Sequence, residues 1–384
     1  MNVKAGRIAG DWLGHPGTQA LCAALEAAGY RALFVGGCVR NAVLGQPVDD
    51  IDIATDARPP AVTQTAEAAG FKVVPTGIDH GTVTVIAGGR PHEVTTFRRD
   101  VSTDGRHAII AFSDRLEEDA ARRDFTMNAL YADARGLLTD PLNGLPDLLA
   151  RRVRFVGEPV ARIREDYLRI LRFFRFQARF GDPAEGFDPD GLAACAAEAE
   201  GLATLSKERI GAEMRKLLAA PDPAPAVATM ALTGILGRVL PGANPQALGP
   251  FLHLSQDAGL AADALARLAA LGGDHPADAL RLSRAEARRL DRLRDAATSS
   301  MRGSEVGYRL GLTEGLFAMV LRSALLEAPL SGLDEVRVGA AAKFPLRASD
   351  LPGLEGAALG QRLRQMEQRW IESGFTLTKA DLLA

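Results

Sequence analysis

Residues 33–55 read L-F-V-G-G-C-V-R-N-A-V-L-G-Q-P-V-D-D-I-D-I-A-T. An apolar run ends in the pair Gly36 and Gly37, and Arg40 follows shortly after it. Backbone N–H groups in a glycine turn and a guanidinium group both complement phosphate oxygens. The stretch therefore predicts a strand, a turn and a polyphosphate site to which Gly36, Gly37 and Arg40 contribute.

Two carboxylates follow this turn. Asp50 and Asp52 alternate with Ile51 and Ile53, so in a strand both carboxylates would leave the same face. Magnesium takes one or two carboxylates together with phosphate oxygens. A glycine pair alone is usually a plain turn, and an isolated D-x-D is usually a solvated strand end. Their order and closeness favour a catalytic site in which Asp50 and Asp52 hold Mg²⁺. The chain has no P-loop and no G-x-G-x-x-G motif that opens a helix.

This segment resembles the signature of the polymerase-β-type nucleotidyltransferases. Within that superfamily it is similar to the class II tRNA nucleotidyltransferases (CCA-adding enzymes) and the bacterial poly(A) polymerases. That branch typically has an Asp after the arginine, where this chain has Asn41. The resemblance implies an α/β nucleotidyltransferase head, built on a mixed sheet with flanking helices, followed by all-α neck, body and tail domains.

Composition is ordinary for a soluble globular protein. The chain has 384 residues, of which 47% are hydrophobic and 24% charged, and this length suggests two to four domains. No apolar run is long enough to cross a membrane, and the N-terminus lacks a signal pattern, so we expect a cytoplasmic protein that does not bind membranes. The three cysteines have no metal-ligand spacing, and we expect core or incidental positions for them.

The two halves of the chain differ in pattern. Strand-like segments lie at 32–35, 51–54, 71–74, 82–87 and 93–97, and helical ones at 18–28 and 60–69. From about residue 151 onward, Ala, Leu, Arg and Glu recur at helical spacing. We expect a catalytic head at 1–150, a helical neck at 151–220, a helical body at 221–300 and a helical tail at 301–384 that contacts tRNA.

Two features in the second half of the head are less decided. Glu93 starts an alternating strand segment and is either a plain strand carboxylate or, as the resemblance implies, a third metal ligand. The polar segment 98–115 has weak periodicity and predicts a mobile loop beside the site.

Residues 119–131 read D-A-A-R-R-D-F-T-M-N-A-L-Y. The string predicts a helix start capped by Asp124 or Thr126. It is also similar to the R-R-D-F-T-x-N-A element of the same family. That resemblance implies that Arg123 and Asp124 bind the sugar and phosphates of the nucleotide, and it leaves the role of Asn128 open.

Residues 165–179, E-D-Y-L-R-I-L-R-F-F-R-F-Q-A-R, predict an amphipathic helix. The polar side could be a solvated face, but it repeats arginine, the residue that recognises planar groups in a bidentate manner. The family resemblance implies that Asp166 and Arg169 match the base edge of the incoming nucleotide and that Arg172 and Arg175 lie near it. The excess of arginine in 151–179 also indicates a polyanionic partner such as RNA.

We therefore expect an enzyme that adds nucleotides from CTP and ATP to the 3′ end of tRNA by a two-metal mechanism and releases pyrophosphate. One alternative is a poly(A) polymerase, although no basic extension follows 374–383, a segment similar to the family's usual ending. A second is an RNA-binding protein that has lost catalysis, against which the paired carboxylates argue. Nothing in the sequence indicates a protein partner, and it leaves open the oligomeric state and whether all of C-C-A is added.

Overall fold

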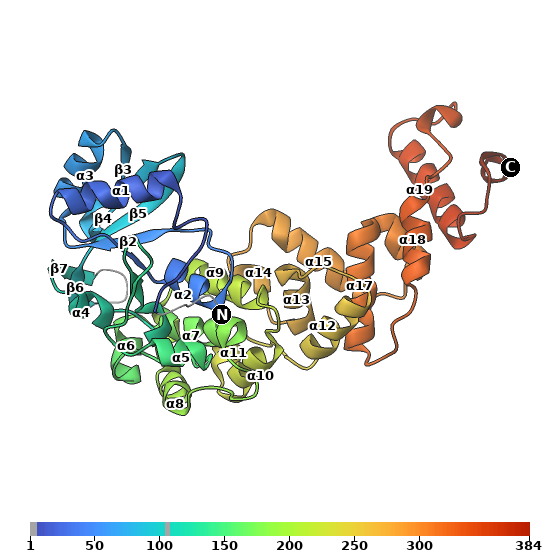
Figure 1. Cartoon of the computed structure of the whole chain (residues 1–384). Helices are drawn as coiled ribbons and strands as arrows, with labels where there is room; N and C mark the ends of the chain where they lie inside the picture. Colours follow the sequence, from blue (N-terminus) through green and yellow to red (C-terminus); the bar gives the residue numbers. More distant parts are fainter. Residues whose placement is uncertain (1–5, 104–107) are drawn as a thin grey trace. The chain divides into compact units, whose positions relative to one another are not determined.

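The computed structural model describes residues 6–103 and 108–384. The chain divides into two compact units (Figure 1). One contains the residues up to Glu213 together with Thr233–Arg238, and the other contains Met214–Leu232 and Val239–Ala384.

A mixed sheet forms the centre of the first unit, as predicted. In the described part of the chain it has seven strands in the order β3-β4-β5-β2-β1-β8-β9. Strands β2 and β5 are parallel, and the other neighbouring pairs are antiparallel. The strands are β1 (Leu33–Val35), β2 (Asp52–Thr55), β3 (Lys72–Gly77), β4 (Thr82–Ala87), β5 (Arg90–Thr96), β8 (Tyr131–Ala132) and β9 (Leu138–Thr139).

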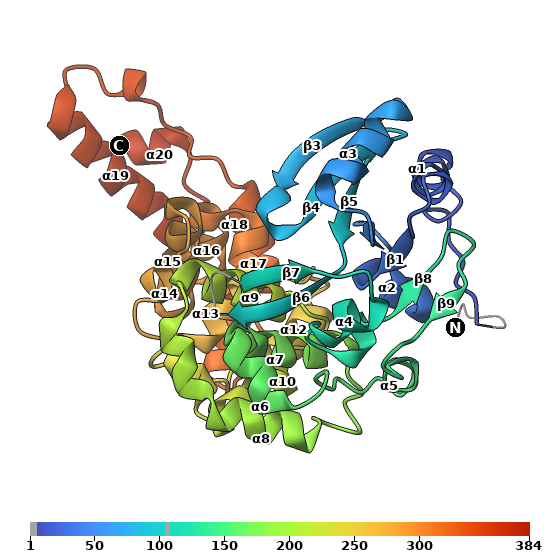
Figure 2. The ribbon, with the colours of Figure 1, turned by 90° about the vertical axis from the view of Figure 1, so that its left-hand side faces the viewer.

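Two helices pack on this sheet. Helix α3 (Pro59–Ala68) lies against β3, β4 and β5, and α1 (Pro16–Ala27) contacts both α3 and β4 (Figure 2). Both helices have proline in their first turn, where the missing N–H costs no hydrogen bond. Thr18 ties α1 to the sheet through a buried hydrogen bond of 2.9 Å between its Oγ1 and His92 Nε2.

Segment 98–115 was predicted to be a loop, and that prediction is wrong for most of it. A two-stranded hairpin forms from β6 (Arg98–Thr103) and β7 (Ala108–Phe112), while 104–107 lie outside the described residues. Contacts distant in sequence hold its end: Arg58 lies over the Phe112 ring at 4.6 Å. A Cβ at Gly81 would lie 2.7 Å from Phe112 Cε1. Because these contacts join residues that are far apart in the sequence, no local periodic pattern indicates the hairpin.

The helix predicted over 165–179 is broken near its start. Helix α6 (Pro159–Glu165) ends before Asp166, whose backbone is extended (φ −156°, ψ 104°), and α7 (Leu168–Phe180) begins two residues later. Asp166 Oδ1 accepts a hydrogen bond of 3.1 Å from the Leu168 N–H. Asp166 therefore caps the new helix instead of continuing the old one, a use for which Asp is well suited.

Aromatic rings attach α7 to the rest of its unit. Phe173 and Phe176 pack within 6.2 and 4.9 Å of the Phe125 ring, and Phe155 stacks on Phe173 at 5.2 Å. The remaining helices that begin in this unit are α2 (Gly37–Leu44), α4 (Leu116–Ala121), α5 (Leu145–Leu149), α8 (Pro189–Ala197), α9 (Lys207–Leu218) and α11 (Ile235–Val239).

The second unit is helical, as predicted for this part of the chain. Its central helix α17 (Leu312–Leu325) contacts α12, α13, α15, α16 and α18. Glycine permits the close packing of α16 on α18, because a Cβ at Gly307 would lie 2.1 Å from the Val336 carbonyl oxygen. The other helices are α10 (Ala224–Leu232), α12 (Leu248–Asp257), α13 (Ala264–Leu271), α14 (Pro276–Ala279), α15 (Arg284–Thr298), α16 (Gly303–Leu310), α18 (Leu333–Ala341), α19 (Gly356–Glu372) and α20 (Lys379–Leu383).

None of the helices in residues 6–103 and 108–384 combines the length and the apolar character that crossing a bilayer demands.

Candidate active site

The predicted glycine turn forms at the end of β1. Gly36 has φ +71° and ψ −120°, a conformation that residues with side chains rarely adopt, and it precedes the first turn of α2. A Cβ at this position would also lie 3.3 Å from Arg123 Nη1. Glycine is thus favoured by the backbone conformation, and the approach of Arg123 leaves little room for a larger residue. The turn and Arg123, far apart in sequence, lie together.

The alternation of acids and isoleucines is also as predicted. Ile51 and Ile53 are buried, with 5% and 0% of their surface exposed, while Asp50 is exposed and Asp52 half-buried. Asp52 lies opposite Glu93 in the register of the parallel strands β2 and β5. The structure therefore brings Asp50, Asp52 and Glu93 to one edge of the sheet.

The electrostatics of this edge favour a cation. Burial, together with the negative charges of Glu93 and Asp50, raises the pKa of Asp52 to about 6, although the charge of Arg123 opposes the rise. Within the described residues, no three His, Cys, Asp or Glu side chains converge into a metal cage. Magnesium does not need one, since one or two carboxylates suffice when phosphate oxygens complete its shell. The carboxylates present fit such an ion.

Arg123 is held by two residues that the sequence analysis did not single out. Its Nη2 donates to Asp119 Oδ2 at 3.0 Å and its Nε to the Tyr131 hydroxyl at 3.1 Å. The Tyr131 hydroxyl in turn donates to Asp119 at 2.7 Å. Although burial alone would raise the pKa of Asp119, the charges of Arg123 and Arg122 outweigh it and lower the pKa to about 2. The spacing of Asp119 and Arg123, four residues apart, could have indicated this pair, whereas nothing local indicated Tyr131.

Asp124 joins the head to α7. Its Oδ2 accepts from Arg172 Nε at 2.8 Å, and its Oδ1 accepts from Asn128 Nδ2 at 2.8 Å. Burial works against ionisation, but Arg172 and these hydrogen bonds lower the pKa of Asp124 overall. Two predicted site residues, Asp124 and Arg172, are thus brought into direct contact. The contact of Asp124 with a sugar stays a prediction.

Arg40 is buried at the same contact between the head and α7. Its Nη1 donates to Asn128 Oδ1 at 2.6 Å, and its Nε and Nη2 donate to Asn41 Oδ1 at 3.2 and 2.9 Å. The guanidinium lies over the Phe180 and Phe176 rings, 4.1 and 5.2 Å from their centres. Burial lowers the pKa of Arg40 to about 10. These contacts support a role in joining α2 to α7, and triphosphate binding by Arg40 stays a prediction.

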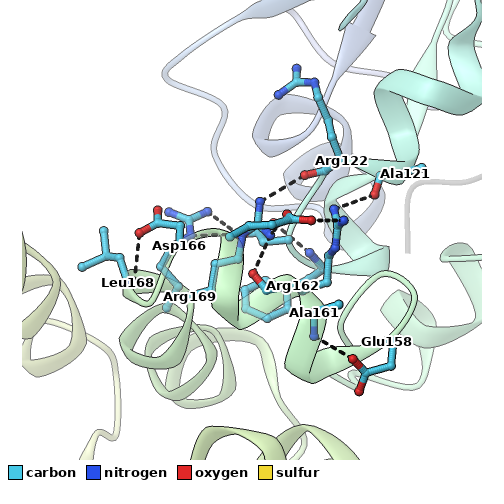
Figure 3. A network of polar contacts seen from close by, with 12 residues as sticks. Ala121, Arg122, Glu158, Ala161, Arg162, Asp166, Leu168 and Arg169 are labelled. Atoms are coloured by element: carbon cyan, nitrogen blue, oxygen red, sulfur yellow. Dashed lines mark hydrogen bonds and ion pairs between the residues drawn. The ribbon is translucent and has the colours of Figure 1, made fainter. Parts of the chain in front are cut away.

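The predicted base-reading residues lie at the start of α7 (Figure 3). Asp166 Oδ2 accepts from Arg209 Nη2 at 2.7 Å. Arg169 donates from Nη1 to Glu165 Oε2 at 2.6 Å and from Nη2 to the Arg122 carbonyl at 3.2 Å. The Arg122 contact ties the start of α7 to the segment that carries Arg123.

Arg175 lies deeper along the same helix. Its Nε donates to Glu213 Oε2 at 2.5 Å, and its guanidinium lies 4.6 Å from the centre of the Phe176 ring. This ion pair holds α9 against α7. A place for Arg175 near the nucleotide stays a prediction.

Comparison with known proteins agrees with this geometry. The family described as the poly A polymerase head domain matches residues 32–154, and the one described as the probable RNA and SrmB-binding site of polymerase A matches 186–246. Among curated proteins, the human mitochondrial CCA tRNA nucleotidyltransferase 1 is 44% identical over 186 residues, 48% of this chain and 43% of that protein. The CCA-adding enzyme of Geobacillus thermodenitrificans is 44% identical over 216 residues, 56% and 52% of the two chains. The chain spans about half the length of the curated relatives that it matches.

Solved structures extend the likeness over most of the chain. The CCA-adding enzyme of Bacillus stearothermophilus in complex with CTP superimposes with a TM-score of 0.75 and 30% identity, covering 93% of this chain and 92% of that one. The Thermotoga maritima CCA-adding enzyme complexed with tRNA has a TM-score of 0.70 at 18% identity, covers 95% and 92%, and shows the shared fold. The head match together with the first of these structures assigns the chain to the nucleotidyltransferase family that contains the CCA-adding enzymes and the bacterial poly(A) polymerases.

Proposed function

We propose that this protein adds C and A nucleotides from CTP and ATP to the 3′ end of tRNA, without a nucleic-acid template, and releases pyrophosphate. The single observation that carries the proposal is the meeting of Asp52, the Gly36 turn and Arg123 at one edge of the sheet. Nucleotidyl transfer needs carboxylates that hold a cation, and beside them positive charge and backbone N–H groups that bind phosphates. The acidic edge, Arg123 and the glycine turn offer these groups.

The relatives support the choice of substrate. Curated relatives that are 44% identical over about half of this chain are named for CCA addition, and the neighbour at 30% identity was solved with CTP. Because of these relatives, we propose that this chain, too, adds nucleotides to tRNA and uses both CTP and ATP.

In the proposed reaction, the 3′-hydroxyl oxygen of the tRNA forms a bond to the α-phosphorus of the nucleotide. The bond from that phosphorus to the pyrophosphate oxygen breaks, and the hydroxyl proton passes to water. Gly36 and Gly37 present backbone N–H groups to the triphosphate. Arg123, fixed by Asp119 and Tyr131, supplies a positive charge that need not reorganise during the reaction.

CCA-adding nucleotidyltransferases depend on metal ions in general, and we propose that the ion here is Mg²⁺. Asp50 and Asp52 would hold it, with Glu93 in support from the neighbouring strand. When bound, Mg²⁺ supplies positive charge that activates the attacking hydroxyl and neutralises the leaving pyrophosphate.

Base selection is assigned to the start of α7. Asp166 offers carboxylate oxygens and Arg169 offers N–H donors, so together they can complement the edges of cytosine and adenine and mismatch those of uracil and guanine. We also propose that Arg172 and Arg175 lie near the nucleotide, a proposal supported for Arg172 by its contact with Asp124; the ion pair with Glu213 would hold Arg175 in position.

The rest of the chain is assigned to RNA binding. We propose that the chain consists of a head (1–150), a neck (151–220), a body (221–300) and a tail (301–384), and that the tail contacts tRNA. A cytoplasmic location is proposed as well.

The test is incorporation with purified protein, tRNA lacking its 3′ C-C-A, and each labelled nucleotide in turn. C should be incorporated first, and A only after C has been added. An unstructured RNA offered under the same conditions should accept far less. Efficient A addition to the unstructured RNA would instead identify a poly(A) polymerase, and no incorporation on either RNA would contradict the proposal.

A further inference from the structure

Two arginines cap the end of α4, directly before the segment that carries Arg123. Arg162 Nη1 donates to the Ala121 carbonyl at 2.9 Å, and Arg169 Nη2 donates to the Arg122 carbonyl at 3.2 Å (Figure 3). The last carbonyls of a helix lack partners within the helix and carry partial negative charge. Cations from α6 and α7 thus satisfy the end of α4.

Arg162 is the centre of this network. Its Nη2 pairs with Glu165 Oε1, and its backbone carbonyl accepts from Arg169 Nη1 at 2.7 Å. The other oxygen of Glu165 accepts from the same Arg169 Nη1 at 2.6 Å. With only 20% of the Arg162 side chain and 12% of the Arg169 side chain exposed, water screens these contacts weakly.

The network decides which part of Arg169 remains available. A guanidinium has five N–H donors, and the contacts to Glu165, the Arg162 carbonyl and the Arg122 carbonyl engage three of them. Within the described residues, the Nε–H and one Nη2–H have no partner. The Nε–H and Nη2–H groups of a guanidinium form one of the two edges that can recognise two neighbouring acceptors in a bidentate manner.

We infer that Arg162 is a positioning residue for base selection: by holding Glu165 and the end of α4, it presents the two remaining donors of Arg169 to the acceptor edge of a cytosine or adenine base. The inference rests on the proposed function and adds to it a residue that need not touch the nucleotide. Arg162 also links base reading to the phosphate side of the site, because the α4 end that it caps leads directly to Arg123.

Loss of Arg162 has a definite consequence. Glu165 loses the partner of its Oε1 and can turn this oxygen toward Arg169 as well, where it competes with the base for a remaining N–H donor. The charge of Arg169 remains in place, so attraction for a triphosphate persists while the directional match to the base is lost.

Neighbouring Arg164 provides a matched control. It lies on the same short helix, but its side chain is 63% exposed and pairs with Glu198 at 2.7 Å. R164Q removes the same charge two residues away without touching Glu165 or α4. The test therefore compares wild type, R162Q, R162K and R164Q for single-nucleotide incorporation from CTP, ATP, UTP and GTP on a tRNA primer.

R162Q should lower the ratio of kcat/KM for CTP over UTP by about tenfold, within the range that one bidentate contact supplies. The KM for CTP should rise less than about threefold. R162K keeps the charge but cannot bond both Ala121 and Glu165 with planar geometry, so it should lose part of the selectivity. R164Q should match wild type. If R162Q fails to fold in a thermal melt, R162K decides the matter.

Unchanged selectivity in the folded Arg162 variants, or an equal loss in R164Q, would overturn the inference. A double-mutant cycle gives a second readout: in an E165Q background, R162Q should reduce selectivity little further, because both act through the same contact. Additive losses would contradict that coupling. Wild-type protein that incorporates no nucleotide would refute the proposed function itself, whereas selective wild type with equally selective Arg162 variants would refute only this inference.

Discussion

Asp52 and Glu93 lie opposite each other in the parallel strands β2 and β5, so their two carboxylates leave the same face of the sheet. Burial and the nearby charges of Glu93 and Asp50 together raise the pKa of Asp52 to about 6. Without a bound cation this arrangement costs folding free energy at neutral pH, because Asp52 must ionise in an unfavourable place. The cost is understandable if the edge exists to bind a cation with its substrate.

This cost can be measured in the metal-free protein. The folded pKa of Asp52 is raised from 3.8 to about 6, so the folded state binds the proton more tightly than the unfolded state, and stability falls as pH rises from about 4 to about 6. At pH 7 metal-free D52N should be more stable than wild type by roughly 1–2 kcal/mol, after allowance for partial solvent screening.

Chemical denaturation of both proteins at pH 4 and pH 7 in a chelator checks this. The difference should shrink toward zero at pH 4, where Asp52 is protonated in wild type. Added Mg²⁺ should stabilise wild type and leave D52N nearly unchanged. Equal stabilisation of both proteins by Mg²⁺ would place the ion elsewhere.

Arg40 and Asn41 predict a change in stability. Arg40 is buried against Phe180 and bonds the amide oxygens of Asn41 and Asn128, whereas the family's usual Asp at position 41 would supply a negative charge. N41D should stabilise the protein by about 1 kcal/mol at most, since an ion pair with Arg40 replaces a bond to an amide oxygen while the bond from Asn41 Nδ2 to the Pro47 carbonyl is lost, and it should change activity little. R40A should destabilise the protein and weaken CTP and ATP binding by a similar factor.

Urea denaturation and nucleotide titrations measure both effects. A large gain in activity from N41D would mean that this chain is a weakened variant of its family. A change in base preference from R40A would show that Arg40 acts on the base.

Tyr131 should matter for phosphate binding. Y131F removes the acceptor of Arg123 Nε and a donor to the buried Asp119, at a cost of about 1–3 kcal/mol. The KM for CTP and for ATP should rise together by about three- to tenfold, with base preference unchanged. Y308F serves as control, because Tyr308 makes a similar bond to Glu367 in the other unit. An equal rise in KM for Y308F would contradict a local effect.

Asp166 and Arg169 should govern base choice. D166A and R169A should each relax selection against UTP and GTP by roughly ten- to hundredfold, which corresponds to about 1–3 kcal/mol of discrimination. The exposed Arg179 lies at the far end of α7, and R179A should mainly weaken RNA affinity in a salt-dependent way. Incorporation from all four nucleotides separates these effects. Wild-type selectivity in both D166A and R169A would leave α7 as an RNA-facing surface only.

Local pattern was enough to predict the parts of the site that one segment specifies. The Gly36 turn and the alternation from Asp50 to Ile53 follow from residue type and spacing, and both appear as expected. The other features of the site depend on contacts between residues that are far apart in the sequence. The burial of Arg40 depends on Phe180, which is far away in sequence, and the hairpin of β6 and β7 is held by Arg58 and Gly81.

The break in the helix at Asp166 could not be predicted from the sequence for a different reason. The helical periodicity of 165–179 continues through Asp166, but its side chain bonds the Leu168 N–H and starts a new helix. An Asp can either continue a helix or cap one, and packing decides between them. The sequence pattern placed Asp166 within a helix, whereas the structure places it at the break between α6 and α7, and its role in base selection stays a prediction.

Sequencing the tRNA 3′ end after reaction with all four nucleotides tests the central claim most directly. tRNA lacking C-C-A should gain only C and A residues with wild-type protein and Mg²⁺, and addition should stop at the restored end. D50A and D52A should add nothing while remaining folded, because the ion loses a carboxylate ligand. Long A tails, incorporation of U or G, or near-normal turnover by D52A would contradict the account.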